Sequence, residues 1–256
     1  MINTDTNEKT KMNWLMTMNK YNTGILFLQI VAHLSLVPMV LYGDWYHYLI
    51  AIFIYFLSGC LGMTMTYHRL LSHKSWNPPK FIEYLFSLFA TIGLTGPAIS
   101  WVAVHREHHA FTDTEKDPHS PNYKGRFYSH VLSMFIKPKI TYAKHLLKDK
   151  FYQTQHTYYF QINLLYAFFL YLIDPFAVIY AWLVPAAILW NAGSSIVSLS
   201  HRNFSTHNDI ILAILVWGEG YHKNHHGNVK SSRFGKVDCG GLLINLLTRK
   251  NKNEVN

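Results

Sequence analysis

Histidines gather in three short clusters of this 256-residue chain: HRLLSH at 68–73, HREHH at 105–109 and HKNHH at 222–226. The clusters hold half of the 16 histidines, namely His68, His73, His105, His108, His109, His222, His225 and His226. Neutral imidazole is the commonest metal ligand among side chains. Because eight imidazoles are too many for one ion, the pattern predicts a site for more than one metal ion, with an almost purely nitrogen ligand set.

The spacing within the clusters indicates how the chain presents these rings. His105, His108 and His109 stand at i, i+3 and i+4, and the third cluster repeats this spacing, so each triplet lies on one face of a helix. His68 and His73 are five residues apart. That interval is not a single helical stripe, so either the pair flanks a site or its helix loosens at the end. Imidazole suits zinc, copper, iron and nickel alike, and ligand type alone does not select the metal.

The elements that position the clusters are predicted to cross a membrane. Half of the residues are hydrophobic and only 14% are charged, against roughly 25% in an average soluble protein. A hydrocarbon core of about 30 Å requires about 20 helical residues. Four apolar segments are therefore predicted to span, at about 24–42, 46–66, 157–173 and 176–198. The segment 81–104 contains Glu83 and three helix-disturbing residues, and we expect a re-entrant or interfacial helix there.

Charge placement predicts the orientation. All 23 Lys and Arg residues fall in the N-terminal tail, in 67–156 or after 200. Four spans place these regions on one face, which the positive-inside rule makes cytoplasmic. Both termini and the metal site are then cytoplasmic, whereas five spans would separate the histidine clusters. The net charge of +9 suits anionic lipid headgroups or an acidic electron donor, and no motif indicates nucleic-acid binding.

The segment limits complete this organisation. We expect a polar N-terminal tail over 1–23, one folded membrane domain over 24–248 and a disordered tail over 249–256. The polar start of the chain does not resemble a signal peptide. Cys60 lies in a predicted span and Cys239 on the cytoplasmic side, so no disulfide is expected.

Four sequence blocks resemble those of the membrane fatty acid desaturases, in particular the delta-9 acyl-CoA and acyl-lipid type. They read HRLLSHKSW, WVAVHREHHAFTDTEKDPHS, GRFYSH and GEGYHKNHHGNVKSSRFG, and the likeness covers roughly residues 45–245. The resemblance implies an all-α integral membrane protein with four transmembrane helices under a cytoplasmic helical cap. It implies that the cap holds two iron ions in a di-iron centre and that O₂ is the co-substrate. It also implies a ninth ligand, His201.

The chain departs from the acyl-CoA members of that family at two places. Val197 stands where animal acyl-CoA desaturases have an Asn that approaches one iron through water. Ala103 and Val104 precede His105 where those enzymes have an Arg-Asp pair that contacts CoA. The first departure implies a weaker or more open ligand set around one iron. The second weakens the case for CoA as the acyl carrier.

The expected activity is O₂-dependent desaturation, with a cis double bond inserted at the delta-9 position of an acyl chain carried on lipid or CoA. A bent apolar tunnel would hold the chain, with Trp76, Thr95, Gly96 and Trp101 as candidates for its wall. Carboxylates that accept the far ring N–H orient metal-bound imidazoles. The candidates for this role are Glu107, Asp113, Asp117 and Glu219.

The remaining histidines and cations receive other roles. His119 and His130 are not expected among the ligands, and neither are the isolated His33, His47, His145, His156 and His207. The sequence contains no Cys cluster for an iron–sulfur centre, so a separate donor, a ferredoxin or a b-type cytochrome, is expected to supply electrons. Its candidate docking residues, which a solvated surface would equally explain, are Arg106, Lys116, Lys124, Lys223 and Arg233.

Three alternatives remain open at this point. Membrane hydroxylases and ketolases share histidine-rich di-iron motifs, although HRLLSH and DPHS favour desaturation. A membrane metal-binding protein without catalysis is a different class, and it predicts histidines within the spans, along a path for the metal. A desaturase-like protein without activity is the third alternative, and Val197 is the residue that favours it.

Overall fold

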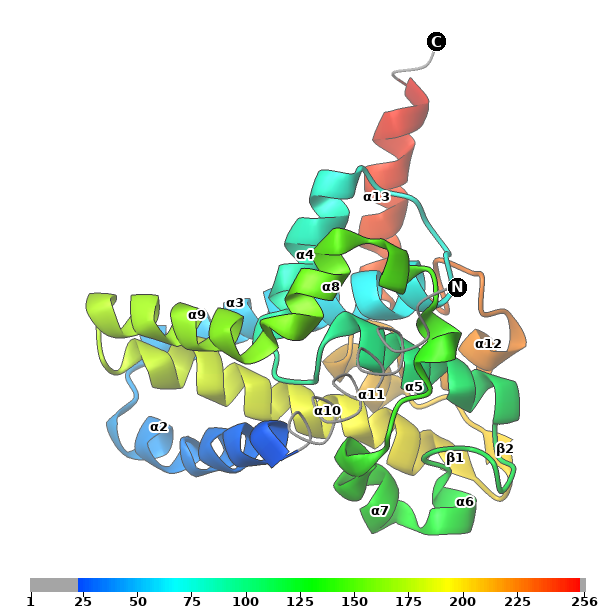
Figure 1. The fold of residues 1–256 in the computed structure, drawn as a ribbon, viewed down its shortest axis with the longest axis horizontal. Coiled ribbons are helices and arrows are strands. Elements are labelled where there is room, and N and C mark those ends of the chain that lie inside the picture. Colours follow the sequence, from blue (N-terminus) through cyan, green and yellow to red (C-terminus); the bar gives the residue numbers. More distant parts are fainter. Residues whose placement is uncertain (1–22, 254–256) are drawn as a thin grey trace, which may run out of the picture.

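The computed structural model describes residues 23–253 and is mostly helical (Figure 1). Its elements are α2 (Leu36–Tyr42), α3 (Trp45–Tyr55), η1 (Phe56–Ser72), α4 (Lys80–Ile92), α5 (Ala98–Phe111), α6 (Pro121–Lys124), α7 (Arg126–His130), η2 (Leu132–Phe135), η3 (Ile140–Ala143), η4 (Leu146–Lys148), α8 (Lys150–Thr157), α9 (Tyr159–Ile173), η5 (Ile179–Leu183), α10 (Val184–Ser200), β1 (His201–Arg202), β2 (Ser205–Thr206), α11 (Ile210–Leu215), α12 (His222–Gly227) and α13 (Cys239–Asn253). The two strands form one short antiparallel pair, with His201 opposite Thr206.

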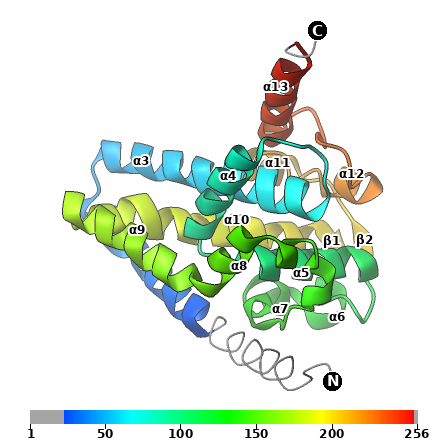
Figure 2. The same cartoon turned by 45° about the horizontal axis from the view of Figure 1, so that its top comes forward.

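Three of the described helices are long and apolar enough to cross a membrane: Thr23–Tyr42, Trp45–Ser72 and Ile179–Ser200. They coincide with the first, second and fourth segments predicted to span. The third segment forms α9, which has only 15 residues, fewer than the roughly 20 that a hydrocarbon core requires. Helices α2, α3, α9 and α10 extend together at one end of the molecule, and the short elements gather at the other (Figures 1 and 2).

The segment 81–104 does not form one continuous helix. Helix α4 ends at Ile92 and α5 begins at Ala98. Between them the backbone of Leu94 and Gly96 adopts positive φ, at 55° and 101°, which breaks regular helical hydrogen bonding. Helix α4 packs closely against η1, because a Cβ added at Gly62 would lie only 2.4 Å from the Ala90 nitrogen. The break therefore turns the chain so that α5 can carry its histidines alongside η1.

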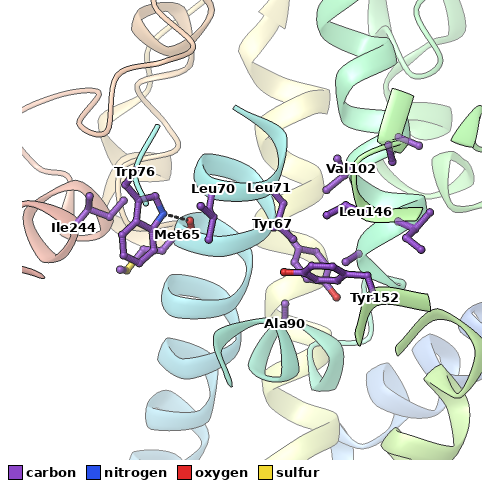
Figure 3. Close-up of a cluster of buried hydrophobic side chains, with 14 of the residues drawn as sticks. Met65, Tyr67, Leu70, Leu71, Trp76, Ala90, Val102, Leu146, Tyr152 and Ile244 are labelled. Atoms are coloured by element: carbon purple, nitrogen blue, oxygen red, sulfur yellow. Dashed lines mark hydrogen bonds between the residues drawn. The ribbon is translucent and has the colours of Figure 1, made fainter. Parts of the chain in front are cut away.

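A buried apolar cluster joins η1 to the elements around it (Figure 3). Met65 and Leu70 of η1 meet Ile244 of α13 on one side, and Tyr67 meets Tyr152 of α8 on the other (Figure 3). Full burial of a large apolar side chain stabilises a fold by about 1.5–3 kcal/mol. The cluster therefore holds η1 in a fixed position against α5, which carries the second histidine cluster.

The C-terminal segment differs from the expectation of a tail that begins at 249. Helix α13 continues to Asn253 and projects from the body of the molecule (Figure 1). The Asp238 carboxylate accepts the backbone N–H of Gly241 at 2.8 Å, and Ile244 is 1% exposed. These contacts anchor the first turns and let the helix extend. The polar N-terminal tail, apart from Thr23, and residues 254–256 lie outside the described part of the chain.

Candidate metal centre

The first histidine pair owes its geometry to an unusual helix. Segment η1 is π-helical, and a π-helix bonds each N–H to the carbonyl five residues earlier. The His73 N–H accordingly donates to the His68 carbonyl at 3.2 Å. The Ser72 hydroxyl also donates across five residues, to the Tyr67 carbonyl at 2.8 Å. The five-residue interval therefore places the two rings one turn apart on one face, with centroids 4.9 Å apart.

The structure brings all nine predicted ligand histidines together in two groups. Within each group the candidate ligand atoms all lie within 4.8 Å of one another. The five-histidine group consists of His68, His73, His105, His109 and His225. The four-histidine group consists of His108, His201, His222 and His226. Helices α5 and α12 contribute to both groups, so the two sites share one framework.

The ring nitrogens within each group face one another. In the five-histidine group, His225 Nε2 lies 3.0 Å from His68 Nε2 and 2.9 Å from His109 Nε2. In the four-histidine group, His222 Nε2 lies 2.8 Å from His201 Nε2 and 3.1 Å from His226 Nε2. A neutral imidazole has one N–H and one lone pair, so one nitrogen cannot satisfy two others that also carry lone pairs. A cation bound between the nitrogens of each group would accept these lone pairs, so the arrangement of the rings fits a bound metal ion.

Three carboxylates hold the outer nitrogens of these rings. Each lies within hydrogen-bond distance of one Nδ1: Glu219 with His68 at 2.7 Å, Asp117 with His108 at 2.9 Å and Asp113 with His201 at 3.0 Å. Donation of Nδ1–H to a carboxylate fixes the tautomer and leaves the Nε2 lone pair free for a metal. Three of the four predicted orienting carboxylates thus lie where that role requires.

Glu107 does not share this arrangement. It is 4% exposed, and its carboxylate pairs with the Lys139 ammonium at 2.5 Å. A position two residues after His105 does not share the face of i, i+3 and i+4. Glu107 therefore attaches α5 to the segment around Lys139, and its carboxylate is given no role in orienting an imidazole.

Burial favours the neutral form of most of the clustered imidazoles. It lowers the pKa of His73, His109 and His226 to about 2, and neighbouring histidines add to the effect. Burial raises the pKa of Asp117 to about 6. For Glu219, His68 and Arg69 outweigh burial and lower the pKa. At neutral pH these three rings are therefore uncharged and able to bind metal, while both carboxylates remain ionised acceptors.

An apolar cavity of about 240 Å³ opens beside both histidine groups. Its wall includes ligand candidates of both groups, His68, His105, His108 and His222, and three predicted tunnel residues, Thr95, Gly96 and Trp101. The fourth tunnel candidate, Trp76, is not part of this wall. It is 7% exposed within the apolar cluster, and its indole N–H donates to the Met65 carbonyl at 2.8 Å (Figure 3). Trp76 therefore stabilises the fold.

His119, which the sequence does not predict to be a ligand, lies beside the centre. It lines the same cavity, and it forms a third group of possible metal-binding atoms with His108 and Asp117. The only sequence signal for this placement is its position two residues after Asp117. His130 lies elsewhere, 3.1 Å from the Ser198 hydroxyl through Nδ1.

The predicted docking cations fall into two kinds. Lys116, Lys124, Lys223 and Arg233 are exposed. The Arg106 guanidinium instead donates to the Ser72 and Leu71 carbonyls at 2.7 and 2.8 Å. It caps the end of η1 from α5, and it is therefore a structural residue.

We expect Asp117→Asn to lower the affinity of the four-histidine group for its ion by about 10–100-fold, the usual effect of losing a partner behind a ligand. The amide can present N–H to His108 Nδ1, and this favours the wrong tautomer. Metal competition titration of the purified protein measures the effect. Glu107→Gln, on the helix that carries His108, is the matched control, because Glu107 pairs with Lys139. Equal affinities in the two variants would contradict the orienting role of Asp117.

Comparison with known proteins agrees with this arrangement. The model of the fatty acid desaturase family matches residues 43–230. The acyl-CoA 5-desaturase AL21 of Anemone leveillei is 32% identical over 94% of this chain and 81% of its own length. The sn-1 stearoyl-lipid 9-desaturase of Synechocystis sp. is 32% identical over 86% and 74%, and the sn-2 palmitoyl-lipid 9-desaturase of Nostoc sp. is 34% identical over 77% and 76%. The chain belongs to the fatty acid desaturase family and is an oxidoreductase that desaturates fatty acyl chains.

Proposed function

We propose that this desaturase holds two iron ions and uses O₂ to insert a cis double bond at the delta-9 position of an acyl chain on a membrane lipid. One observation carries the proposal: nine imidazoles from distant segments converge in two groups at the wall of an apolar cavity. Within the described residues, no cysteine belongs to either group. Donor chemistry alone leaves the metal open, and the family resemblance favours iron.

No side chain can remove hydrogen from an unactivated methylene. The two ions, when bound, would supply the necessary oxidising power together with O₂ and two electrons. The chain itself supplies position. The Trp101 ring stacks on His105 with centroids 4.9 Å apart, so the cavity wall and the ligand set are one packed unit. The apolar wall excludes water and aligns one C–C bond of the substrate with the ligand rings.

The lining of the cavity favours a lipid over CoA as the acyl carrier. The described residues that line it include no Lys or Arg. Ala103 is fully buried, and Val104 faces the cavity, so the turn before His105 offers no cation to the phosphates of CoA. A mostly apolar cavity whose described lining includes no such cation suits a chain that enters from the bilayer.

We further propose four spans with α9 as the third, and a cytoplasmic cap. The turns at 43–44 and 174–175 contain no Lys or Arg, which supports their place on the outer face. Eight of the nine ligand histidines lie outside the three candidate spans, and His68 lies near the end of one. This argues against a path for metal through the membrane. A ferredoxin or b-type cytochrome would approach the exposed Lys116 and Lys223.

Expression in a host that lacks its own desaturases tests the proposal. We expect monounsaturated fatty acids with the double bond at carbon 9, found in intact lipids before they appear in the acyl-CoA pool. Mass spectrometry separates the alternatives, because desaturation removes two hydrogens and a hydroxylase or ketolase adds oxygen. A product that gains oxygen would reject desaturation, and a product formed first on CoA would reject the proposed carrier.

A further inference from the structure

His119 presents a ring nitrogen that the proposed ligand set does not use. The side chain is 9% exposed, and among the described residues its Nε2 has no hydrogen-bond partner. The ring lines the apolar cavity together with His108 and His222. A buried polar nitrogen without a partner is unfavourable, and such groups in folded proteins usually bind water, an ion or a ligand.

His119 is attached to the four-histidine group through a shared carboxylate. Asp117 is fully buried; its Oδ1 accepts the His119 backbone N–H at 3.0 Å, and its Oδ2 accepts His108 Nδ1–H at 2.9 Å. The His119 and His108 ring centroids lie 4.6 Å apart. One carboxylate therefore fixes both the ligand ring and the segment that carries the unpartnered ring.

The two histidine groups differ in the number of nitrogens that they offer. One contains five imidazoles and the other four, and His119 is not a member of either. Val197, which lines the same cavity, contributes only an apolar side chain. His119 is thus a polar group that lies beside His108 of the group with fewer ligands.

We propose that His119 Nε2 accepts a hydrogen bond from a water molecule that completes the shell of the ion in the four-histidine group. This inference rests on the proposed two-metal function. A metal-bound water is a strong donor, and a neutral imidazole nitrogen is a suitable acceptor for it. His119 is then a positioning residue, which acts through the water and does not itself bind the ion.

Cobalt(II) titration of the purified full chain in lipid nanodiscs tests this role. We expect His119→Phe to lower the affinity of the four-histidine group for cobalt by about 10–100-fold and to leave the affinity of the other group unchanged. The visible cobalt spectrum of the weakened site should change with its coordination number. The His201→Ala variant shows which cobalt equivalent belongs to that group. His119→Gln should restore part of the affinity, because its amide oxygen can accept from water.

His130→Phe is the matched control, because His130 bonds Ser198 outside both groups, and it should bind cobalt like the wild type. Wild-type affinity and spectrum in His119→Phe would overturn the inference. Equal weakening of both ions would also overturn it, because it would show a general structural role. If the wild type bound fewer than two cobalt ions, the proposed two-metal function itself would fail.

Discussion

His108→Ala is expected to lower double-bond formation by more than about 1000-fold, because metal activation of a reaction contributes several kcal/mol and each 1.36 kcal/mol is tenfold in rate. His108 is 1% exposed and belongs to the four-histidine group. Its loss removes one nitrogen donor and leaves the buried Asp117 carboxylate without the ring that it orients. Fatty-acid profiling of the expressing desaturase-deficient host measures the effect.

The matched control for this variant is His207→Ala. His207 follows β2, and its Nε2 contacts the Arg202 carbonyl of β1 at 3.1 Å. It belongs to neither histidine group. This variant should retain wild-type product. Comparable protein levels in the membrane fraction exclude poor expression as the cause of a lost product. Full activity in His108→Ala would refute its assignment as a ligand.

Arg69→Met is expected to destabilise the protein by about 3–5 kcal/mol, the usual cost of removing one partner from a buried charge pair. Arg69 is fully buried, and its guanidinium contacts Glu219 at 3.2 Å and Asp238 at 2.9 Å. It also donates to the Ser232 carbonyl at 2.7 Å. The variant leaves two buried carboxylates without their cation and loosens the loop that follows α12.

Thermal unfolding in detergent measures this loss, and the midpoint should fall by at least about 6 °C. Lys80→Met is the matched control, because the Lys80 side chain is 64% exposed. Its partner Glu83 is buried but keeps the Tyr152 hydroxyl as a donor at 2.9 Å, so the loss should stay at about 0–1 kcal/mol, as for a solvent-screened pair. Because Glu219 also holds His68, Arg69→Met should lower the affinity of the five-histidine group for its ion. An unchanged midpoint would contradict the role given to Arg69.

Local spacing predicts much of the candidate site. The i, i+3, i+4 triplets are properties of one helix, and the structure places each on one face. Asp117 and Asp113 follow soon after the second cluster, so proximity in the chain makes them reasonable partners. Glu107 is equally near in sequence, yet its carboxylate pairs with Lys139. Sequence distance therefore indicates candidates, and helical phase determines which of them reach a ring.

Other features depend on contacts between distant segments. The five-residue interval of the first pair is explained only by the π-helical bonds of η1. Trp76 lies in the apolar cluster because the Met65 carbonyl accepts its N–H. His119 reaches the cavity because the turn after α5 folds back on His108. These placements are set by tertiary packing, which no local pattern in the sequence describes.

Hydropathy predicts the positions of the apolar helices well. Three of four predicted spans satisfy the criteria for length and composition. The third, predicted at about 157–173, forms α9 at Tyr159–Ile173, so its ends agree closely with the prediction, but its 15 residues are too few for a span. Hydropathy indicates which segments are apolar, while helix ends depend on local hydrogen bonding, so the end of α13 required the structure.

The metal content of the active protein tests the central claim most directly. We predict two iron ions per chain in the purified, active wild type, measured by elemental analysis against protein concentration. His201→Ala, which removes one ring of the four-histidine group, should retain about one iron and form no double bond. An active wild type with less than one iron per chain, or a His201→Ala variant that keeps two ions and full activity, would contradict the two-metal account.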